Sequence, residues 1–262
     1  MNTIWLIGKG TFGDAMRRKI LNVFLLVALA LIATGFASGE LNPKQDIIIV
    51  KSLGLGIIAL AGVFISVILF INLIPIEIER RTIYTILSKP VQRYEFLIGK
   101  FVGGLMTVFV NILLMGLAFV LLVAIKEHGF TKDVLDCLQG VLMIFFQIAL
   151  VGGMALCFSV LVSPFVNFFL SFALYLLGSM DILETLARDP NHTKNPIITG
   201  FFSILHTIVP NFGNFNIQNP IIHPDVIIKS QGLYIAQNAV YALVYIAIFL
   251  TIAHIAFERR EV

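Results

Sequence analysis

Long apolar runs alternate with short polar segments along most of the chain. About 20 apolar residues in a helix are enough to cross a hydrocarbon core about 30 Å thick. The first run is the shortest, and Asp181 and Glu184 interrupt the fifth. The pattern predicts an all-α integral membrane protein with six transmembrane helices: Ile20 to Phe36, Leu53 to Ile74, Phe101 to Ile125, Val141 to Val162, Phe165 to about Leu186, and Tyr234 to Phe257.

Two further segments lie outside these runs. Residues 1–19 mix apolar and basic side chains, which is typical of an amphipathic helix in the headgroup region, and we expect this helix to form an elbow before the first span. Residues 187–232 form the longest external connection and are rich in Pro and Asn. Within it, the apolar stretch Ile197 to Val209 is too short to span, so we expect an interfacial or re-entrant segment. The whole chain, 1–262, is predicted to be a single transmembrane domain.

A dense group of charges at residues 77–100 separates the second apolar run from the third. By the positive-inside rule its basic residues place it on the cytoplasmic side. Eleven of the 18 basic residues then fall on predicted cytoplasmic segments and seven on outer segments, so both termini are expected in the cytoplasm. A short cytoplasmic connection between two spans is a place where a soluble partner can hold a membrane protein.

Composition excludes several classes of protein. The chain is 58% hydrophobic and 13% charged, whereas an ordinary soluble domain is about 25% charged. A net charge of +3, with bases at the predicted span ends, gives no indication of nucleic-acid binding. Cys137 and Cys157 lack metal-ligand spacing and are too few for a disulfide framework, so we interpret both as packing residues.

Motifs for catalysis and cofactor binding are mostly missing. The chain has no G-x-x-x-x-G-K-[ST] motif, and therefore no P-loop with which to hydrolyse ATP by itself. Gly8, Gly10 and Gly13 match G-x-G-x-x-G, but no strand precedes them, and we interpret them as turn residues before the first span. The five histidines are dispersed, so no metal site is predicted. We therefore expect no cofactor to be bound by this chain.

Polar side chains inside the predicted spans are few and uncharged. None of these spans has an acidic or basic residue at its centre, as ion-coupled transport usually requires. The weakly polar interior suits an amphiphilic or lipid-linked passenger better than a naked ion. The alternative is that each amide makes a helix-to-helix hydrogen bond worth about 0.6 kcal/mol. The candidates for a translocation path are Asn111, Gln147, Asn167, Ser171 and Tyr175.

The charged group also carries a resemblance to a known family. The sequence Glu79 to Val91, followed by Arg93 and Gly99-Lys100, resembles the cytoplasmic connection of ABC-2-type permeases, the membrane subunits of type V exporter-like ATP-binding-cassette transporters. Val209 to Phe212, with Phe215-Asn216, also resembles a feature of these permeases. The resemblance covers essentially the whole chain. It is closest to compact permeases that serve multidrug export, gliding machinery or copper-site maturation of nitrous-oxide reductase.

The resemblance implies an assembly. A permease of this kind lies in the bacterial cytoplasmic membrane, pairs with a second copy or a close paralogue, and works with separate nucleotide-binding subunits that hold ATP and Mg. Its passenger route is expected between protomers, near the second and fifth spans. The resemblance does not imply which passenger is moved. The alternative is a non-transporting scaffold or regulatory subunit that docks an ATPase, for example in cofactor or metalloenzyme maturation.

Residues 76–100 are predicted to form a coupling segment. Ile76 to Leu87 are expected to continue the second span as a helix, and Ser88-Lys89-Pro90 to interrupt it. Pro90 can then open a second short helix, because its missing N–H is tolerated in a first turn. Such a helical lever would move when an attached ATPase closes. The alternative is a solvated helix at the membrane surface. The candidates for ATPase docking or coupling are Glu77, Glu79, Arg80, Arg81, Ser88, Lys89, Pro90, Arg93 and Glu95.

Overall fold

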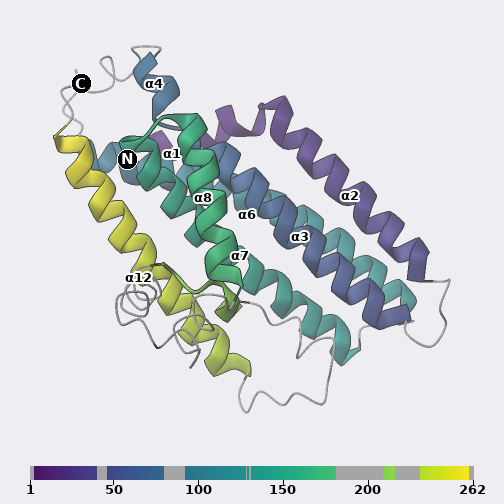
Figure 1. Cartoon of the computed structure of the whole chain (residues 1–262). Coiled ribbons are helices and arrows are strands. Elements are labelled where there is room, and N and C mark those ends of the chain that lie inside the picture. The colour runs from purple at the N-terminus through teal and green to yellow at the C-terminus, as the bar shows by residue number, and fades with distance from the viewer. Residues whose placement is uncertain are drawn as a thin grey trace, which may run out of the picture.

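The computed structural model describes residues 3–39, 46–79, 92–127, 129, 131–180, 209–215 and 231–259. Over these residues all regular structure is helical, which confirms the predicted all-α class. The helices, labelled in Figure 1, are α1 (Thr3–Met16), α2 (Lys19–Gly39), α3 (Asp46–Ile71), α4 (Pro75–Glu79), α6 (Arg93–Lys126), α7 (Lys132–Leu161), α8 (Pro164–Ser179), the 3-10 helix η1 (Phe212–Phe215) and α12 (Gln231–Glu258).

Five of the six predicted spans correspond to helices long and apolar enough to cross a membrane. The fifth predicted span corresponds to α8, which has 16 residues. At 1.5 Å per residue α8 is about 24 Å long, shorter than a typical hydrocarbon core. The predicted end of that span near Leu186 lies outside the described residues. The five qualifying segments are Lys19–Phe36, Val50–Glu79, Arg93–Lys126, Val134–Leu161 and Gly232–Glu258.

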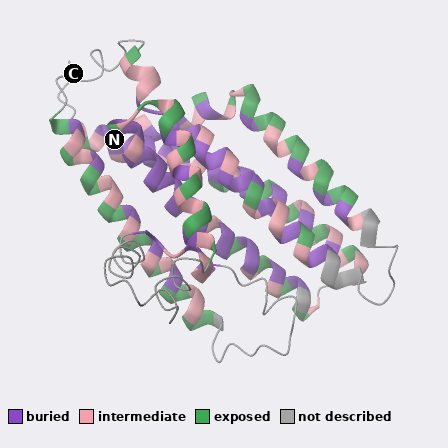
Figure 2. Ribbon diagram, viewed as in Figure 1, coloured by how far each residue is buried: buried purple, intermediate pink, exposed green. Residues whose placement is uncertain are grey.

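The helices form a bundle in which α3, α6 and α7 are central. In the most apolar 18-residue stretch of each helix, 67% of α3 and 78% of α7 is buried inside the bundle. The corresponding shares are 17% for α2 and 22% for α12. The same contrast is visible in Figure 2, where buried residues gather on the central helices and exposed residues on α2 and α12. α2 packs on α3 and α12 packs on α7. The outer helices therefore present much of their apolar surface outward, as expected in lipid.

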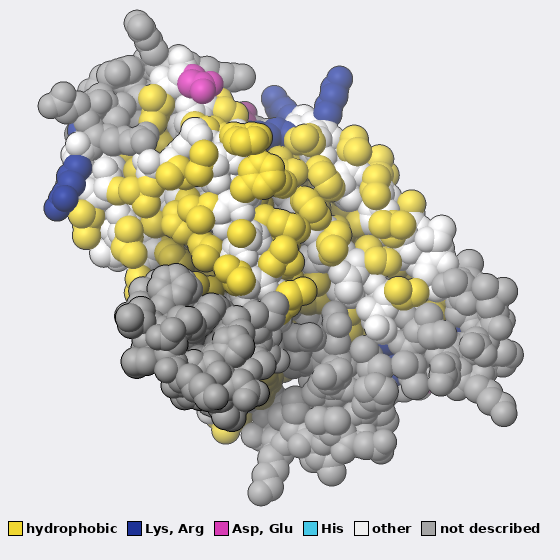
Figure 3. Space-filling model, viewed as in Figure 1, with side chains coloured by type: hydrophobic (Ala, Val, Ile, Leu, Met, Phe, Trp, Pro, Cys, Tyr) yellow, Lys and Arg dark blue, Asp and Glu magenta, His cyan; other side chains and the backbone are white. Residues whose placement is uncertain are grey.

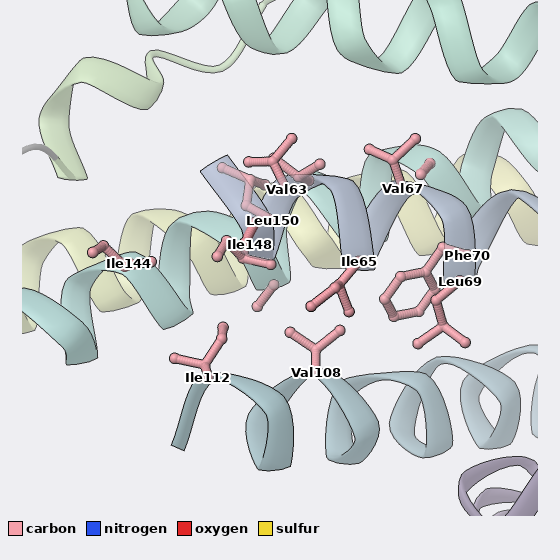
Figure 4. Close-up of a cluster of buried hydrophobic side chains, with 14 of the residues drawn as sticks. Val63, Ile65, Val67, Leu69, Phe70, Val108, Ile112, Ile144, Ile148 and Leu150 are labelled. Carbon is pink, nitrogen blue, oxygen red and sulfur yellow. The ribbon is translucent and has the colours of Figure 1, made fainter. Parts of the chain in front are cut away.

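Phe70 is at the centre of the contact between α3, α6 and α7. Figure 4 shows the Phe70 ring near Leu69 and Ile65 of α3, on the side of the cluster where Val108 of α6 also lies. A Cβ added at Gly104 of α6 would lie 2.6 Å from the Phe70 ring, and one at Gly152 of α7 would lie 2.4 Å from it. Only glycine leaves room for the ring at both positions. These two glycines therefore allow close approach of α6 and α7 to α3.

Helix α1 packs on α6 through its backbone. A Cβ added at Gly103 would lie 2.4 Å from the Gly8 carbonyl oxygen and 2.6 Å from Cβ of Thr11. Gly8, Thr11 and Ala15 are the buried residues of α1, and their spacing places them on one helical face. Ile7 also lies against α6, since a Cβ added at Gly99 would lie 2.8 Å from Cβ of Ile7, whereas Trp5 is 48% exposed.

The glycines of α1 were interpreted above as turn residues, and this interpretation is wrong. Gly8, Gly10 and Gly13 all lie inside the helix. Gly8 is buried against α6, whereas a Cβ at Gly10 or Gly13 would meet nothing within 4 Å. Close packing in lipid favours a small residue at Gly8 even though glycine weakens a helix.

The break at the end of the second span also differs from the prediction. α3 ends at Ile71 and α4 begins at Pro75, so the helix does not continue without interruption into residues 76–87. Pro75 lacks an N–H group, and its ring would clash with the carbonyl of residue 71 in a continuous helix. The backbone N–H groups of Glu77 and Ile78 instead donate to the Ile74 carbonyl at 3.1 and 3.2 Å. The predicted break at Ser88 to Pro90 lies outside the described residues.

Replacing Gly103 with Val should destabilise the α1–α6 contact by about 1 to 3 kcal/mol, because the new side chain would overlap the backbone of α1. Thermal unfolding of the detergent-purified chain measures this as a lower midpoint temperature. Gly10→Ala is the matched control, because its Cβ enters open space and alanine favours the helix. Equal midpoints for Gly103→Val and the unmodified chain would contradict backbone packing of α1 on α6.

Candidate functional site

One end of the bundle brings together the elements on either side of residues 80–91. We call this the junction; it comprises residues 75–79, 92–100 and 254–259. Glu77 of α4 and Lys100 of α6 form an ion pair across it, with side chains that are only 19% and 8% exposed. The Lys100 ammonium also lies 5.6 Å from the centre of the Phe96 ring. Because two charges removed from water require compensation, this pair holds α4 against α6.

Arg93 joins the start of α6 to the end of α12. Its guanidinium donates to the carbonyl oxygens of Phe257 and Glu258 at 3.0 and 3.1 Å. It also lies 5.8 Å from the centre of the Phe257 ring, which stacks on Phe96. The last carbonyls of a helix have no partner within the helix and carry partial negative charge, so a cation is well placed there. Arg93 therefore turns into the protein, toward α12.

Glu95 makes a hydrogen bond within the chain, whereas Glu79 is exposed. The Glu95 carboxylate accepts a hydrogen bond of 3.2 Å from the Gln92 backbone N–H and stabilises the first turn of α6. Glu79 is exposed at the last residue of α4. The other predicted docking residues, which are Arg80, Arg81, Ser88, Lys89 and Pro90, lie outside the described part of the chain.

The junction thus divides the predicted docking residues into two groups. Glu77, Arg93 and Glu95 make contacts within the chain, and Glu79 faces outward. Lys100 and Phe257, which sequence reasoning did not select as site residues, complete the junction. Lys100 could have been selected from the sequence, because it is a basic residue directly before the third apolar run.

Three of the five predicted path residues make hydrogen bonds within a helix or to a neighbouring helix. Asn111 donates to the Thr107 carbonyl of its own helix at 2.8 Å. Asn167 of α8 donates to the Ala155 carbonyl of α7 at 2.9 Å, and Ser171 donates to the Asn167 side-chain oxygen at 2.8 Å. Asn167 therefore makes the helix-to-helix hydrogen bond that was the alternative to a role in a translocation path. Asn111 makes its hydrogen bond within one helix.

The other two path residues meet a segment that enters the bundle away from the junction. We call residues 209–215 the inserted segment. The Gln147 amide donates to the Phe212 carbonyl at 3.2 Å, and the rings of Tyr175 and Phe212 lie 5.4 Å apart. Both also line a cavity of about 80 Å³. This volume holds a few water molecules and is far below the 300 Å³ or more of a typical ligand pocket.

Two tyrosines of α12 also hold the inserted segment. The Asn211 N–H donates to the Tyr241 hydroxyl at 2.8 Å, and the Tyr234 hydroxyl donates to the Asn214 carbonyl at 2.6 Å. Phe212 and Phe215 are fully buried. Gly178 of α8 provides the space, since a Cβ there would lie 2.4 Å from the Pro210 carbonyl oxygen. The segment thereby fastens α7, α8 and α12 to one another.

Sequence reasoning found this segment only in part. The expected interfacial or re-entrant stretch ended at Val209, and most of it lies outside the described residues. Tyr234 and Tyr241 were missed, although their spacing of seven residues places them on one face of α12. Among the described residues no group of three or more His, Cys, Asp or Glu side chains could hold a metal ion.

The family profile described as ABC-2 family transporter protein matches residues 5–262. No curated protein shows significant sequence similarity to the chain.

Replacing Glu77 with Gln should destabilise the junction by about 3 to 5 kcal/mol, because Lys100 would keep a buried charge without its carboxylate. The double variant Glu77→Gln/Lys100→Met should recover much of this loss. Thermal unfolding in detergent measures both. Glu79→Gln is the matched control on the same short helix and should be neutral, because its side chain is exposed. If Glu77→Gln and Glu79→Gln melt at the same temperature, the ion pair does not hold α4.

Replacing Tyr241 with Phe should loosen the inserted segment, because the Asn211 N–H loses its hydroxyl acceptor. A net hydrogen bond is worth about 1 kcal/mol, so amides of residues 209–215 should exchange about fivefold faster. Hydrogen–deuterium exchange with mass spectrometry measures this. Thr251→Ala, which removes only a bond within α12 itself, is the control. Unchanged exchange in Tyr241→Phe would mean that the tyrosine does not hold the segment.

Proposed function

Since the chain belongs to the ABC-2 family of transporter membrane proteins, we propose that it is the permease subunit of an ATP-binding-cassette exporter. It moves a lipid-like or amphiphilic passenger across the bacterial cytoplasmic membrane. ATP, with Mg, is bound and hydrolysed by a separate nucleotide-binding subunit. The junction carries this proposal, because it is where movement of residues 80–91 would reach the transmembrane helices.

The contacts of the junction support a mechanical role for the segment between α4 and α6. Closure of an ATPase pair bound to residues 80–91 would pull on the end of α4 and the start of α6 together, because the Glu77–Lys100 ion pair joins them. Arg93 would carry the same displacement to the end of α12 through its two carbonyl contacts. One movement outside the membrane would thus reach three helices of the bundle.

The candidate residues then have two roles. Glu79, Arg80, Arg81, Ser88, Lys89 and Pro90 are the proposed contacts to the ATPase. Glu77, Arg93 and Glu95 are positioning residues that hold the ends of the segment. This division follows from the inward contacts of the second group and the exposure of Glu79.

The proposed passenger route lies between two permease copies. The cavity at Gln147 and Tyr175 is too small for an amphiphile. A two-fold pair with α3 and α8 facing the partner would enclose a larger path. α8 presents an apolar face for this purpose, with Phe165 at 74% and Phe169 at 57% exposure. Such a wall accommodates an apolar tail and offers little to an ion.

The orientation is proposed from charge. Arg17, Arg18 and Lys19 at the start of α2, together with Arg259 after α12, abut helices that span. The positive-inside rule then places the junction and both chain ends in the cytoplasm.

Reversing the charges of Glu79, Arg80 and Arg81 together should weaken binding of the ATPase. Removing charge-assisted contacts from a partly buried interface costs about 2 to 5 kcal/mol. The proposed nucleotide-binding subunit would be co-expressed and co-purified with the permease in nanodiscs, and the mass should correspond to two copies of each.

Lys132→Glu, an exposed charge reversal at the start of α7, is the control and should leave recovery of the ATPase unchanged. Normal recovery of the ATPase with the triple variant would show that residues 79–81 do not dock it. A complex that assembles but gives no passenger-dependent ATP hydrolysis in vesicles would favour a scaffold over an exporter.

A further inference from the structure

A groove lies between α2 and α3, separate from the junction and the inserted segment. Its volume is about 330 Å³ and its walls are almost entirely apolar. Phe24, Val27 and Leu31 line it from α2, and Gly56 and Leu60 line it from α3. Val27 and Leu31 are about half exposed, at 51% and 49%. The groove is therefore open along the outer face of the bundle, and its occupant must be an apolar chain.

The groove has the depth of a lipid tail in one leaflet. Its α2 wall begins at Phe24, which stacks on Phe64 with ring centres 5.8 Å apart. From Lys19 at the start of α2 to Phe24 the helix rises about 8 Å, and to Leu31 about 18 Å. One leaflet contributes about 15 Å to the hydrocarbon core. An acyl chain whose headgroup is level with Lys19 would thus run along the groove.

A basic turn stands at the end of the groove nearer Phe24. Arg17, Arg18 and Lys19 are consecutive between α1 and α2, and Arg17 and Lys19 are exposed. Figure 3 shows Lys and Arg side chains projecting at the end of the molecule where α2 begins. Trp5 on the neighbouring α1 is about half exposed, as is typical of tryptophan at headgroup level. The basic turn thus immediately precedes the helix that forms one wall of the groove.

We propose that this groove and basic turn bind one anionic phospholipid. Its acyl chain lies between α2 and α3, and its phosphate contacts Arg17 and Lys19. Each basic residue near a membrane surface favours an anionic lipid by about fivefold. This site is independent of the passenger and of ATP.

A second copy of the chain is a poorer occupant of the groove. In a two-fold contact made through this groove, α2 of both copies would lie at the interface. The basic turns at the starts of both α2 helices would then lie at that interface, and like charges across an interface disfavour it. An anionic lipid instead neutralises the turn and fills the groove.

Fluorescence quenching by brominated lipid tests the proposal directly. Trp5 is the single tryptophan of the chain, so Trp5→Phe/Val27→Trp places one reporter at the rim of the groove. Purified chain would be reconstituted in phosphatidylcholine vesicles containing increasing fractions of dibrominated phosphatidylglycerol or dibrominated phosphatidylcholine. Phosphatidylglycerol should bind at least about fivefold more strongly at this reporter. Arg17→Gln/Lys19→Gln should abolish the preference, and high salt should reduce it.

Two matched variants complete the experiment. Trp5→Phe/Ile248→Trp places the reporter on the exposed face of α12, where both lipids should quench equally. Gly56→Leu fills the groove without a clash, since a Cβ there meets nothing within 4 Å. It should remove the preference at position 27, and native mass spectrometry should show loss of the phosphatidylglycerol retained by the unmodified chain.

Two results would overturn the proposal. Equal quenching by both lipids at position 27, matching position 248, would mean an ordinary lipid annulus. If both lipids quench weakly at position 27 but normally at position 248, protein such as a second copy covers the groove.

Discussion

The ion pair between Glu77 and Lys100 is the interaction on which the junction depends. The chain is 13% charged, and these two charges come from either side of residues 80–91 to meet where both side chains are largely buried. Neither side chain is easily moved alone, because each would then leave a charge without compensation. The distance between the end of α4 and the start of α6 is therefore fixed, and with it the span that residues 80–91 must bridge. In the proposed function this makes the segment a handle on two helices at once.

Close packing transmits that constraint into the bundle. Helices in lipid gain little from burying apolar side chains against each other, so they rely on small residues that let backbones approach. Gly103 lets α1 rest on α6, and Gly104 with Gly152 lets the Phe70 ring join α3, α6 and α7. Away from the junction, the inserted segment fastens α7, α8 and α12 through Gln147, Tyr234 and Tyr241. α2 lies outside these contacts, and the apolar groove forms beside it.

The apolar runs predicted the helices because length and hydropathy decide which segments can cross a membrane. The break at Pro75 was also readable, since a proline is a local signal, but it lay at the edge of a run that otherwise looked continuous. The inward turn of Arg93 was not readable, because its partners Phe257 and Glu258 lie 164 and 165 residues away. The partner of Gln147 was not readable either. A polar residue in an apolar run indicated a role in function or in packing, and only the fold shows that Gln147 donates to the Phe212 carbonyl. Pattern identifies candidate residues, whereas their partners depend on tertiary structure.

Distance measurement between the two proposed protomers tests whether the junction couples ATP use to helix movement. Tyr94 is exposed at the start of α6, and Cys137 and Cys157 are both buried, so a spin label at Tyr94→Cys in a background without these cysteines reports the junction alone. Double electron–electron resonance on the permease–ATPase complex would compare the nucleotide-free state with a state trapped by ATP and vanadate. If the junction carries the coupling, the distance distribution between the two labels shifts when the ATPase pair closes. An identical distribution in both states, with the ATPase bound, would contradict coupling through the junction.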